Sequence, residues 1–299
     1  MKRIYVAGSG GMLGDALYNA FSEHEMFCSD ISLNERWLSF LDFRDSEAYS
    51  RQVRAFEPDV LMHVGAHTDL EYCEMNTDDA WATNFIAVKT AVSIANDLDI
   101  PLAYIGTAGV FDGNKELYDD WDTPNPIGVY AQTKFAGERY VVENARRYLI
   151  GRAGWMMGGG PRKDKKFVQK IMSQLHAGVS ELLVVNDRFG APTYTHDFAR
   201  TMKYLLHEER WGLYNVACTG SASRHDVASE ILRIMGLSDR VHVTAVDSSH
   251  FRQAYFAPRP KSERLVNRKL ALMGIQTMGR WENALADYLE RDYKDYLRT

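Results

Sequence analysis

Two side chains with complementary acid–base chemistry stand four residues apart, at Tyr130 and Lys134. On a helix this spacing places both on the same face. A hydride delivered to a carbonyl leaves an alkoxide that needs a proton, and a phenol supplies one when a nearby ammonium stabilises its anion. The pair therefore predicts a reductase site in which Tyr130 is the acid and Lys134 supplies the charge, unless the spacing has arisen by chance.

A third polar group supports this hypothesis. Thr107 follows the apolar run at 102–105, which predicts a buried strand. Because ligands of open α/β folds bind beyond the carboxyl ends of the strands, we expect the Thr107 hydroxyl to hydrogen-bond the carbonyl oxygen of the substrate. By the same geometry, Lys134 would also hold the nicotinamide ribose of a cofactor.

A glycine-rich turn predicts that cofactor. Gly8, Gly11 and Gly14 lie between an apolar run at 4–7 and a helical pattern that begins near residue 13. The first glycine would allow a tight turn, the second a close approach to a pyrophosphate, and the third close packing of helix and strand. Glycines also occur in ordinary turns, but the strand before and the helix after favour a dinucleotide site.

Acidic residues after this turn bear on the choice of cofactor. Asp30 follows the apolar segment 26–28, where a carboxylate accepts both ribose hydroxyls and repels a 2'-phosphate, and no Arg or Lys follows until Arg36. NAD(H) is therefore favoured, and NADP(H) stays open. The pair Asp42 and Phe43 fits either adenine contact or a helix-capping Asp followed by a core Phe, and a loop or cap role is the alternative for Asp30 as well.

An α/β scaffold is needed to bring these residues together. Short apolar runs at 4–7, 60–64 and 102–105 alternate with helical patterns, such as the one at 81–95. This alternation is typical of a parallel sheet with crossover helices. The expected fold class is α/β, a Rossmann-like doubly wound parallel sheet with a smaller, non-contiguous C-terminal substrate-binding domain.

The pattern changes after residue 156. Glycines and a proline interrupt it, the charged stretch 162–166 follows, and a helix is expected from Phe167. The charged stretch fits a solvated loop or a contact for a substrate pyrophosphate. An apolar run at 182–185 predicts a strand that returns to the first domain. The nucleotide-binding domain is expected at 1–156 with return segments near 181–217, and the smaller substrate domain at 157–180 and 218–299.

Composition weighs against several classes of function. The 299 residues carry a formal net charge of -5, which argues against nucleic-acid partners. Cys28, Cys73 and Cys218 are too few and too scattered for a disulfide framework or a zinc ligand set, and no metal site is expected. Neither a signal-peptide core nor an apolar run long enough to span a bilayer is present. We therefore expect a soluble, cytoplasmic protein with no membrane partner.

Taken together, residues 8–14, Thr107 and 130–134 resemble the extended short-chain dehydrogenase/reductases. Other segments make the chain similar to the dTDP-4-dehydrorhamnose reductase family over nearly its whole length, namely 66–68, 106–113, 185–195 and 257–265. The resemblance implies NAD(P)H-dependent reduction of the C4 ketone of a nucleotide-linked 4-keto-6-deoxy sugar. It also implies a nucleotide-sugar partner and, as the family expectation, a homodimer.

Residue roles follow from the same resemblance. It implies that Thr107, Tyr130 and Lys134 are catalytic and that Trp155 stacks on the sugar next to Thr107, unless this Trp belongs to the core. Besides Tyr130 and Lys134, the implied cofactor contacts are Gly8, Gly11, Met12, Leu13, Asp30, Asp42, Phe43, Gly65, Ala66 and His67.

Two departures from the family bear on the reaction. Where the family usually carries Asp-Tyr after the threonine, this chain has Ala108 and Gly109, and His63 stands in place of the usual Asn. The small residues are more similar to nucleotide-sugar 4-epimerases, which retain NAD. They weigh against a dehydratase, because Ala108 cannot transfer a proton. A third hypothesis is a noncatalytic, cofactor-binding regulatory subunit, because the family also resembles the β subunit of methionine adenosyltransferase.

Overall fold

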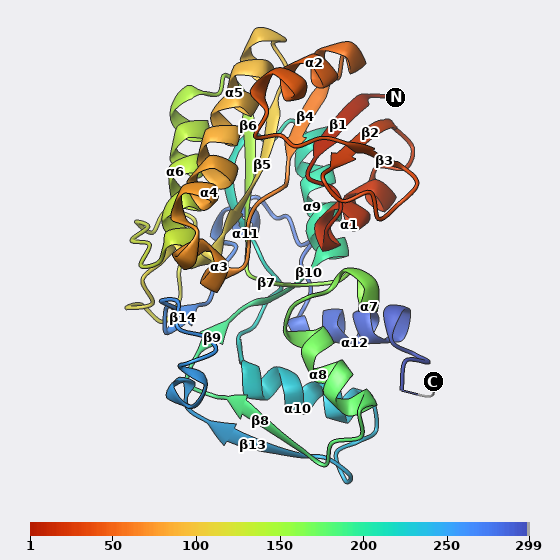
Figure 1. Ribbon diagram of the computed structural model, residues 1–299, viewed down its shortest axis with the longest axis vertical. Coiled ribbons are helices and arrows are strands. Elements are labelled where there is room, and N and C mark those ends of the chain that lie inside the picture. The colour runs from red at the N-terminus through yellow and green to blue at the C-terminus, as the bar shows by residue number, and fades with distance from the viewer. Residues whose placement is uncertain (298–299) are drawn as a thin grey trace.

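The larger domain is built on one parallel sheet. The computed structural model describes residues 1–297, and the sheet occupies the upper domain in Figure 1. The strand order is β11-β6-β5-β4-β1-β2-β3, and all neighbouring strands are parallel. The chain adds β2 and β3 on one side of β1 and then continues from β4 on the other side, so the topological switch point lies between β1 and β4. The Rossmann-like fold class is confirmed. The strands are β1 (Arg3–Ala7), β2 (Glu25–Asp30), β3 (Leu38–Phe40), β4 (Val60–His63), β5 (Leu102–Thr107), β6 (Tyr148–Ala153) and β11 (Gly212–Val216).

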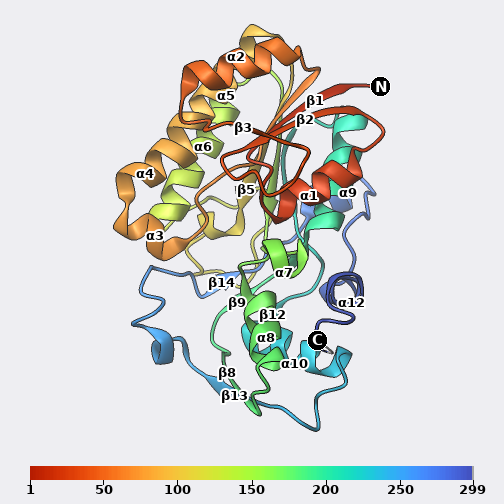
Figure 2. The ribbon, with the colours of Figure 1, turned by 45° about the vertical axis from the view of Figure 1, so that its right-hand side comes forward.

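Helices cover both faces of this sheet (Figures 1 and 2). On β1, Ile4 and Val6 contribute to one core, and Tyr5 and Ala7 to the other, as the alternation of a pleated strand requires. The first core includes α1 and α9, and the second includes α2, α5 and α6. These helices are α1 (Met12–Ala20), α2 (Ser46–Phe56), α5 (Ala87–Asp97), α6 (Val129–Asn144) and α9 (Thr195–His207).

The helix expected at 81–95 is interrupted. It consists of the end of α4 (Thr77–Trp81), a π-helical turn η1 (Ala82–Ile86) and α5. A π-helical turn widens the backbone by one residue per turn and occurs often at functional sites. Here it brings Asn84 against the loop that follows β4, where its side chain accepts from the His67 N–H at 2.8 Å and donates to the His67 carbonyl at 3.0 Å.

The smaller domain occupies the lower half of Figure 1 and surrounds its own helices with short sheets. Its helices are α7 (Gly160–Lys163), α8 (Phe167–His176), α10 (Arg224–Ile234) and α12 (Trp281–Asp292), so the helix expected from Phe167 is present. The pairs are β7 (Trp155–Met157) with β10 (Pro192–Tyr194), β8 (Glu181–Val185) with β13 (His242–Val246), and β9 (Phe189–Gly190) with β12 (Ala222–Ser223) and β14 (Ser262–Glu263).

The return of the chain to the large sheet differs in part from the expectation. Residues 212–216 do return, as the edge strand β11 beside β6, and α9 packs against α1. The run at 182–185, which we expected to return as well, instead forms β8 and pairs with β13 in the smaller domain. An apolar run specifies a buried strand but not the sheet that receives it.

Polar contacts join the two domains at several points. Arg259, in the loop before β14, forms a bidentate ion pair with Glu71 of α3 (Leu70–Met75) at 2.7 and 2.8 Å. Lys166 donates to the Thr68 carbonyl at 2.9 Å. Within residues 1–297, no helix is both long and apolar enough to cross a membrane.

Candidate active site

The three predicted catalytic residues meet at the carboxyl edge of the sheet. Thr107 is the last residue of β5, and Tyr130 and Lys134 lie on the first two turns of α6. The Thr107 hydroxyl hydrogen-bonds with the Tyr130 phenol and accepts from the Gly109 N–H at 3.1 Å. Two hydroxyl groups therefore stand side by side, the arrangement needed to bind one carbonyl oxygen.

Burial controls the proton affinity of the tyrosine. Desolvation raises the pKa of Tyr130 to about 12, although its hydrogen bond with Thr107 acts in the opposite direction. Lys134 is not among the groups that set this pKa in the structure, where the loss of water around the phenol dominates, so the role of Lys134 as the charge beside Tyr130 stays a prediction. A phenol of such high pKa carries its proton at neutral pH, as the acid in a reduction must.

The Lys134 ammonium is buried and has no polar partner among the described residues. It lies 4.1 Å from the centroid of the Tyr104 ring, and no group among residues 1–297 forms a hydrogen bond or ion pair with its Nζ. Desolvation lowers the pKa of Lys134 to about 7, while the Glu138 carboxylate, one turn further along α6, opposes this shift. Such a group has three donors available for a ligand.

Two acidic residues hold α6 in this position. Glu74 accepts from the Val129 N–H at 2.7 Å and so satisfies one of the unpaired amides at the start of the helix. Glu138 and Arg152 of β6 form a fully buried ion pair, with distances of 2.6 and 2.9 Å. Sequence reasoning missed both residues, because Glu74 lies 55 positions from Val129 and because Arg152 lies on a different element from Glu138.

The glycine turn has the shape of a ligand cradle. Gly8 has a φ of 84°, and a Cβ on it would lie 2.2 Å from the Gly65 Cα. A Cβ on Gly14 would lie 2.0 Å from the Ser9 carbonyl oxygen, whereas one on Gly11 would meet nothing within 4 Å. No side chain caps α1, which begins at Met12. Free helix amides beside open space fit the pyrophosphate of a dinucleotide.

Asp30 closes this turn at the end of β2. Its two carboxylate oxygens accept from the N–H groups of Gly10 and Ser32, each at 2.8 Å. The carboxylate therefore orients the glycine turn and stands next to it, at the strand end where a ribose would bind.

The remaining predicted adenosine contacts lie on the neighbouring loops. Asp42 forms an ion pair with Arg44 at 2.6 Å and does not cap α2, since Asp45 performs that function. Phe43 packs so closely on Gly65 that a Cβ there would come within 2.3 Å of its ring. The loop from Gly65 through Ala66 to His67 is held in place by Asn84, a residue that sequence reasoning missed.

Trp155 borders the site from the other domain. The indole is partly buried, its Nε1 donates to Glu263 at 2.7 Å, and the Arg224 guanidinium lies over the ring at 3.6 Å from the centroid. A sugar that stacks on this ring would share it with Arg224, so the stacking role stays a prediction. Sequence reasoning missed Glu263 and Arg224, because nothing in the sequence connects them with residues 107–155.

The charged stretch 162–166 is neither a free loop nor an open anion site. Lys163 is buried and forms ion pairs with Asp15 at 3.0 Å and Glu35 at 3.2 Å. Asp164 is buried too and accepts from the Tyr288 hydroxyl at 2.9 Å. This stretch therefore connects the two domains, because Lys163 contacts the larger domain and Asp164 contacts α12 of the smaller one.

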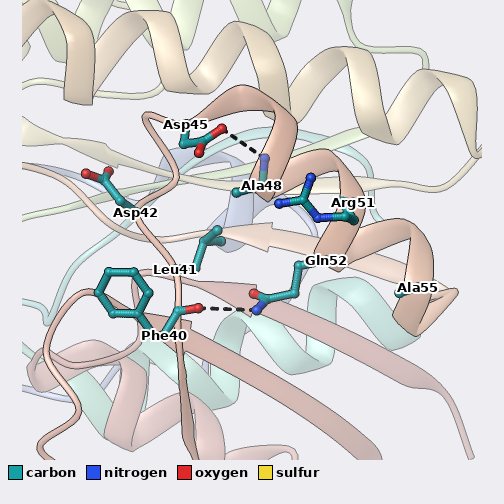
Figure 3. Close-up of a pocket in the computed structure, with 8 residues that line it drawn as sticks. All are labelled: Phe40, Leu41, Asp42, Asp45, Ala48, Arg51, Gln52 and Ala55. Atoms are coloured by element: carbon teal, nitrogen blue, oxygen red, sulfur yellow. Dashed lines mark hydrogen bonds between the residues drawn. The ribbon is translucent and has the colours of Figure 1, made fainter.

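A hollow in the larger domain lies beside the cofactor side of the site (Figure 3). It is formed by β3, α2 and the loop between them, where Gln52 donates to the Phe40 carbonyl at 3.2 Å. It shares Asp42 with the predicted adenosine contacts but none of the catalytic residues.

Comparisons with known proteins agree with this geometry. The sequence matches the RmlD substrate binding domain family over residues 1–294. The chain belongs to this family. It is 31% identical to a dTDP-4-dehydrorhamnose reductase of Mycobacterium tuberculosis, with 96% of this chain and 92% of that protein covered.

Two further comparisons extend this similarity. A crystal structure of dTDP-4-dehydrorhamnose reductase from Bacillus anthracis in complex with NADP superposes with a TM-score of 0.87, at 29% identity and with 97% and 99% of the two chains covered. The chain is also 23% identical to methionine adenosyltransferase 2 subunit beta of Danio rerio, with 96% and 90% covered.

Proposed function

We propose that this chain reduces the C4 ketone of a nucleotide-linked 4-keto-6-deoxy sugar with NAD(P)H. The observation that supports this most directly is the side-by-side arrangement of the Thr107 and Tyr130 hydroxyls, with Lys134 one turn further along α6 and without a hydrogen-bond or ion-pair partner for its ammonium among residues 1–297.

The cofactor fits the cradle of glycines. The amides that begin α1 would hold its pyrophosphate, Asp30 the adenosine ribose, and Lys134 the nicotinamide ribose. When bound, a reduced nicotinamide supplies the hydride for the ketone carbon. Residues 65–67 would form the wall beside it, because Asn84 fixes this loop and Phe43 fills the space behind Gly65.

The residues of the chain then manage the proton and the developing charge. Thr107 and Tyr130 hydrogen-bond the ketone oxygen, and this bond strengthens as negative charge grows on that oxygen. The phenol proton passes from the Tyr130 oxygen to the substrate oxygen. Lys134 stabilises the tyrosinate that remains, since an ammonium favours a nearby anion.

The proposed cofactor preference is NADH over NADPH. The Asp30 carboxylate stands at the ribose position and repels a 2'-phosphate, and the nearby Arg44 is already paired with Asp42 and Asp79, each at 2.6 Å. In Asp30→Asn the ratio of kcat/KM for NADPH to that for NADH should rise, because the negative charge is removed. An unchanged ratio would show that Asp30 does not select the cofactor.

The test of the reductase proposal is NADH consumption with dTDP-, GDP-, CDP- and UDP-linked 4-keto-6-deoxy sugars offered in turn. We expect turnover with one of them, and a loss of roughly 10²- to 10⁴-fold in kcat for Tyr130→Phe with NADH binding intact. Tyr140→Phe, the same change further along α6, serves as the matched control. Unchanged turnover in Tyr130→Phe would refute the assignment.

Two other outcomes would redirect the proposal. The small residues Ala108 and Gly109 favour a 4-epimerase, and cofactor that co-purifies at about one per chain, together with silence in the NADH assay, would support that activity. If no NADH is consumed and no cofactor co-purifies, but a stable partner enzyme is recovered by pull-down, the result would support a regulatory subunit.

A further inference from the structure

A carboxylate from the smaller domain reaches the proposed reaction centre. A Cβ placed on Gly109 would lie 3.4 Å from Glu263 Oε1, 3.4 Å from Thr107 Oγ1 and 3.8 Å from Tyr130 Cε1. Three groups from segments far apart in the chain therefore converge on one glycine. Two of them are proposed catalytic residues, and the third has no role in the mechanism above.

The absence of a side chain at 109 makes room for this carboxylate. A Cβ at that position would lie in van der Waals contact with Glu263 at 3.4 Å, so a side chain that extends further in this direction would enter the space that the carboxylate occupies. In this chain the glycine and the glutamate are thus complementary in volume.

The carboxylate is held by one oxygen and leaves the other available. Glu263 Oε2 accepts from Trp155 Nε1 at 2.7 Å, and within residues 1–297 no hydrogen bond to Oε1 is formed. The backbone beside it is fixed, since β14 pairs with β9 and the Ser262 hydroxyl donates to the Glu116 carbonyl at 2.6 Å. A positioned acceptor beside a reaction centre is suited to a donor on the substrate.

The Arg224 guanidinium lies near the Glu263 carboxylate but forms no hydrogen bond with Oε1 among the described residues. The Arg224 guanidinium lies over the Trp155 ring and interacts electrostatically with Glu263, yet it forms no ion pair with it among the described residues. Burial raises the pKa of Glu263, whereas Trp155, Arg224 and Arg259 act to lower it. Burial is the largest effect, so the pKa of Glu263 is raised, and Arg224 supplies a nearby positive charge that opposes this shift while leaving Oε1 open.

We propose that Glu263 is a substrate-binding residue that selects the sugar: its Oε1 accepts a hydrogen bond from the hydroxyl next to the reacting carbon. This inference rests on the proposed function, because it places the substrate ketone at Thr107 and Tyr130. In a 4-keto-6-deoxyhexopyranose, C5 carries the methyl group and the ring oxygen, so the neighbouring hydroxyl is the one on C3. The substrate class is therefore a sugar nucleotide with a free 3-hydroxyl.

The kinetic test compares two substrates, a dTDP-4-keto-6-deoxyhexose and its 3-deoxy counterpart. In Glu263→Ala, kcat/KM for the 3-hydroxy substrate should fall about 10- to 100-fold, while kcat/KM for the 3-deoxy substrate should change less than about threefold. Glu116→Ala, which removes an exposed glutamate of a neighbouring loop, should affect neither. Equal losses on both substrates, or no loss on either, would overturn the proposal. If the alanine variant does not fold, Glu263→Met provides the same comparison, because it keeps the length of the side chain and removes the carboxylate.

A binding measurement separates this inference from the reductase proposal. Calorimetry gives the affinity of dTDP-L-rhamnose relative to dTDP, which needs no turnover. If the wild type turns over no ketone but Glu263→Ala loses the affinity that the sugar adds, with dTDP binding unchanged, the reductase proposal fails and the role of Glu263 stands. If the sugar adds the same affinity in both proteins, the role of Glu263 fails whatever the wild type reduces.

Discussion

The buried ion pair between Glu138 and Arg152 offers a strong test of how α6 is positioned. Glu138→Gln keeps the shape of the side chain but leaves the Arg152 charge without a counterion in a site where both side chains are at most 4% exposed. Breaking such a pair costs about 3–5 kcal/mol. At about 2.1 cal/mol/K per residue, unfolding 299 residues has an entropy of ~0.6 kcal/mol/K. The expected fall in Tm is therefore about 5–8 °C.

Circular dichroism melts of three further variants check this reasoning. Glu138→Gln combined with Arg152→Met removes both charges and should recover part of the loss, because no unpaired charge stays buried. Glu143→Gln breaks the exposed pair with Arg139 and should lower Tm by about 1 °C or less. Arg152→Met alone should resemble Glu138→Gln. A Tm of Glu138→Gln within 1 °C of the wild type, or a double variant no more stable than both single ones, would refute the argument.

Three further predictions concern the cofactor side. Gly14→Ala should abolish NADH binding in a fluorescence titration, because its Cβ would lie 2.0 Å from the Ser9 carbonyl oxygen; binding within twofold of the wild type would contradict this. Asn84→Ala should raise the KM for NADH more than it lowers kcat, since the side chain holds His67, and an unchanged KM would count against that role. The lowered pKa of Lys134, about 7, means that above pH 7 the unfolded chain binds more protons than the folded one, so stability should rise between pH 7 and 9 by up to ~1.4 kcal/mol per pH unit more than in Lys134→Met. Urea unfolding at each pH measures the free energy of unfolding. If this free energy changes with pH equally in the two proteins, the effect is excluded.

The sequence predicted most reliably what is local. Gly8 and Thr107 lie at the ends of apolar runs that form β1 and β5, and Gly14 lies in α1, the helix expected after the first run. The run at 182–185 was recognised as a strand but assigned to the wrong sheet, because its partner β13 lies about sixty residues later. The π-helical turn at 82–86 could not be predicted, since one extra residue in a turn hardly changes the spacing of apolar residues along the helix.

The meeting of Thr107, Tyr130 and Lys134 at one edge of the sheet was predictable from the sequence, but the groups around them were not. Tyr130 and Lys134 are linked by their spacing on one helix, whereas Glu263 is 133 positions from Tyr130 and only the folded chain brings them together. The high pKa of Tyr130 was also beyond the sequence, because the extent of burial decides its direction.

The return of residues 195–216 to the large domain constrains how this protein can be rebuilt. β11 completes the sheet and α9 covers α1, so a fragment that ends at residue 157 would expose the apolar face of α1 and lose an edge strand. A substrate domain from a relative cannot be transplanted as one block, since its two parts are separated by a segment that the larger domain needs. Under the role proposed for Glu263, a change of sugar selectivity is better sought by paired point substitutions across the domain boundary, with positions 109 and 263 as the first pair to vary.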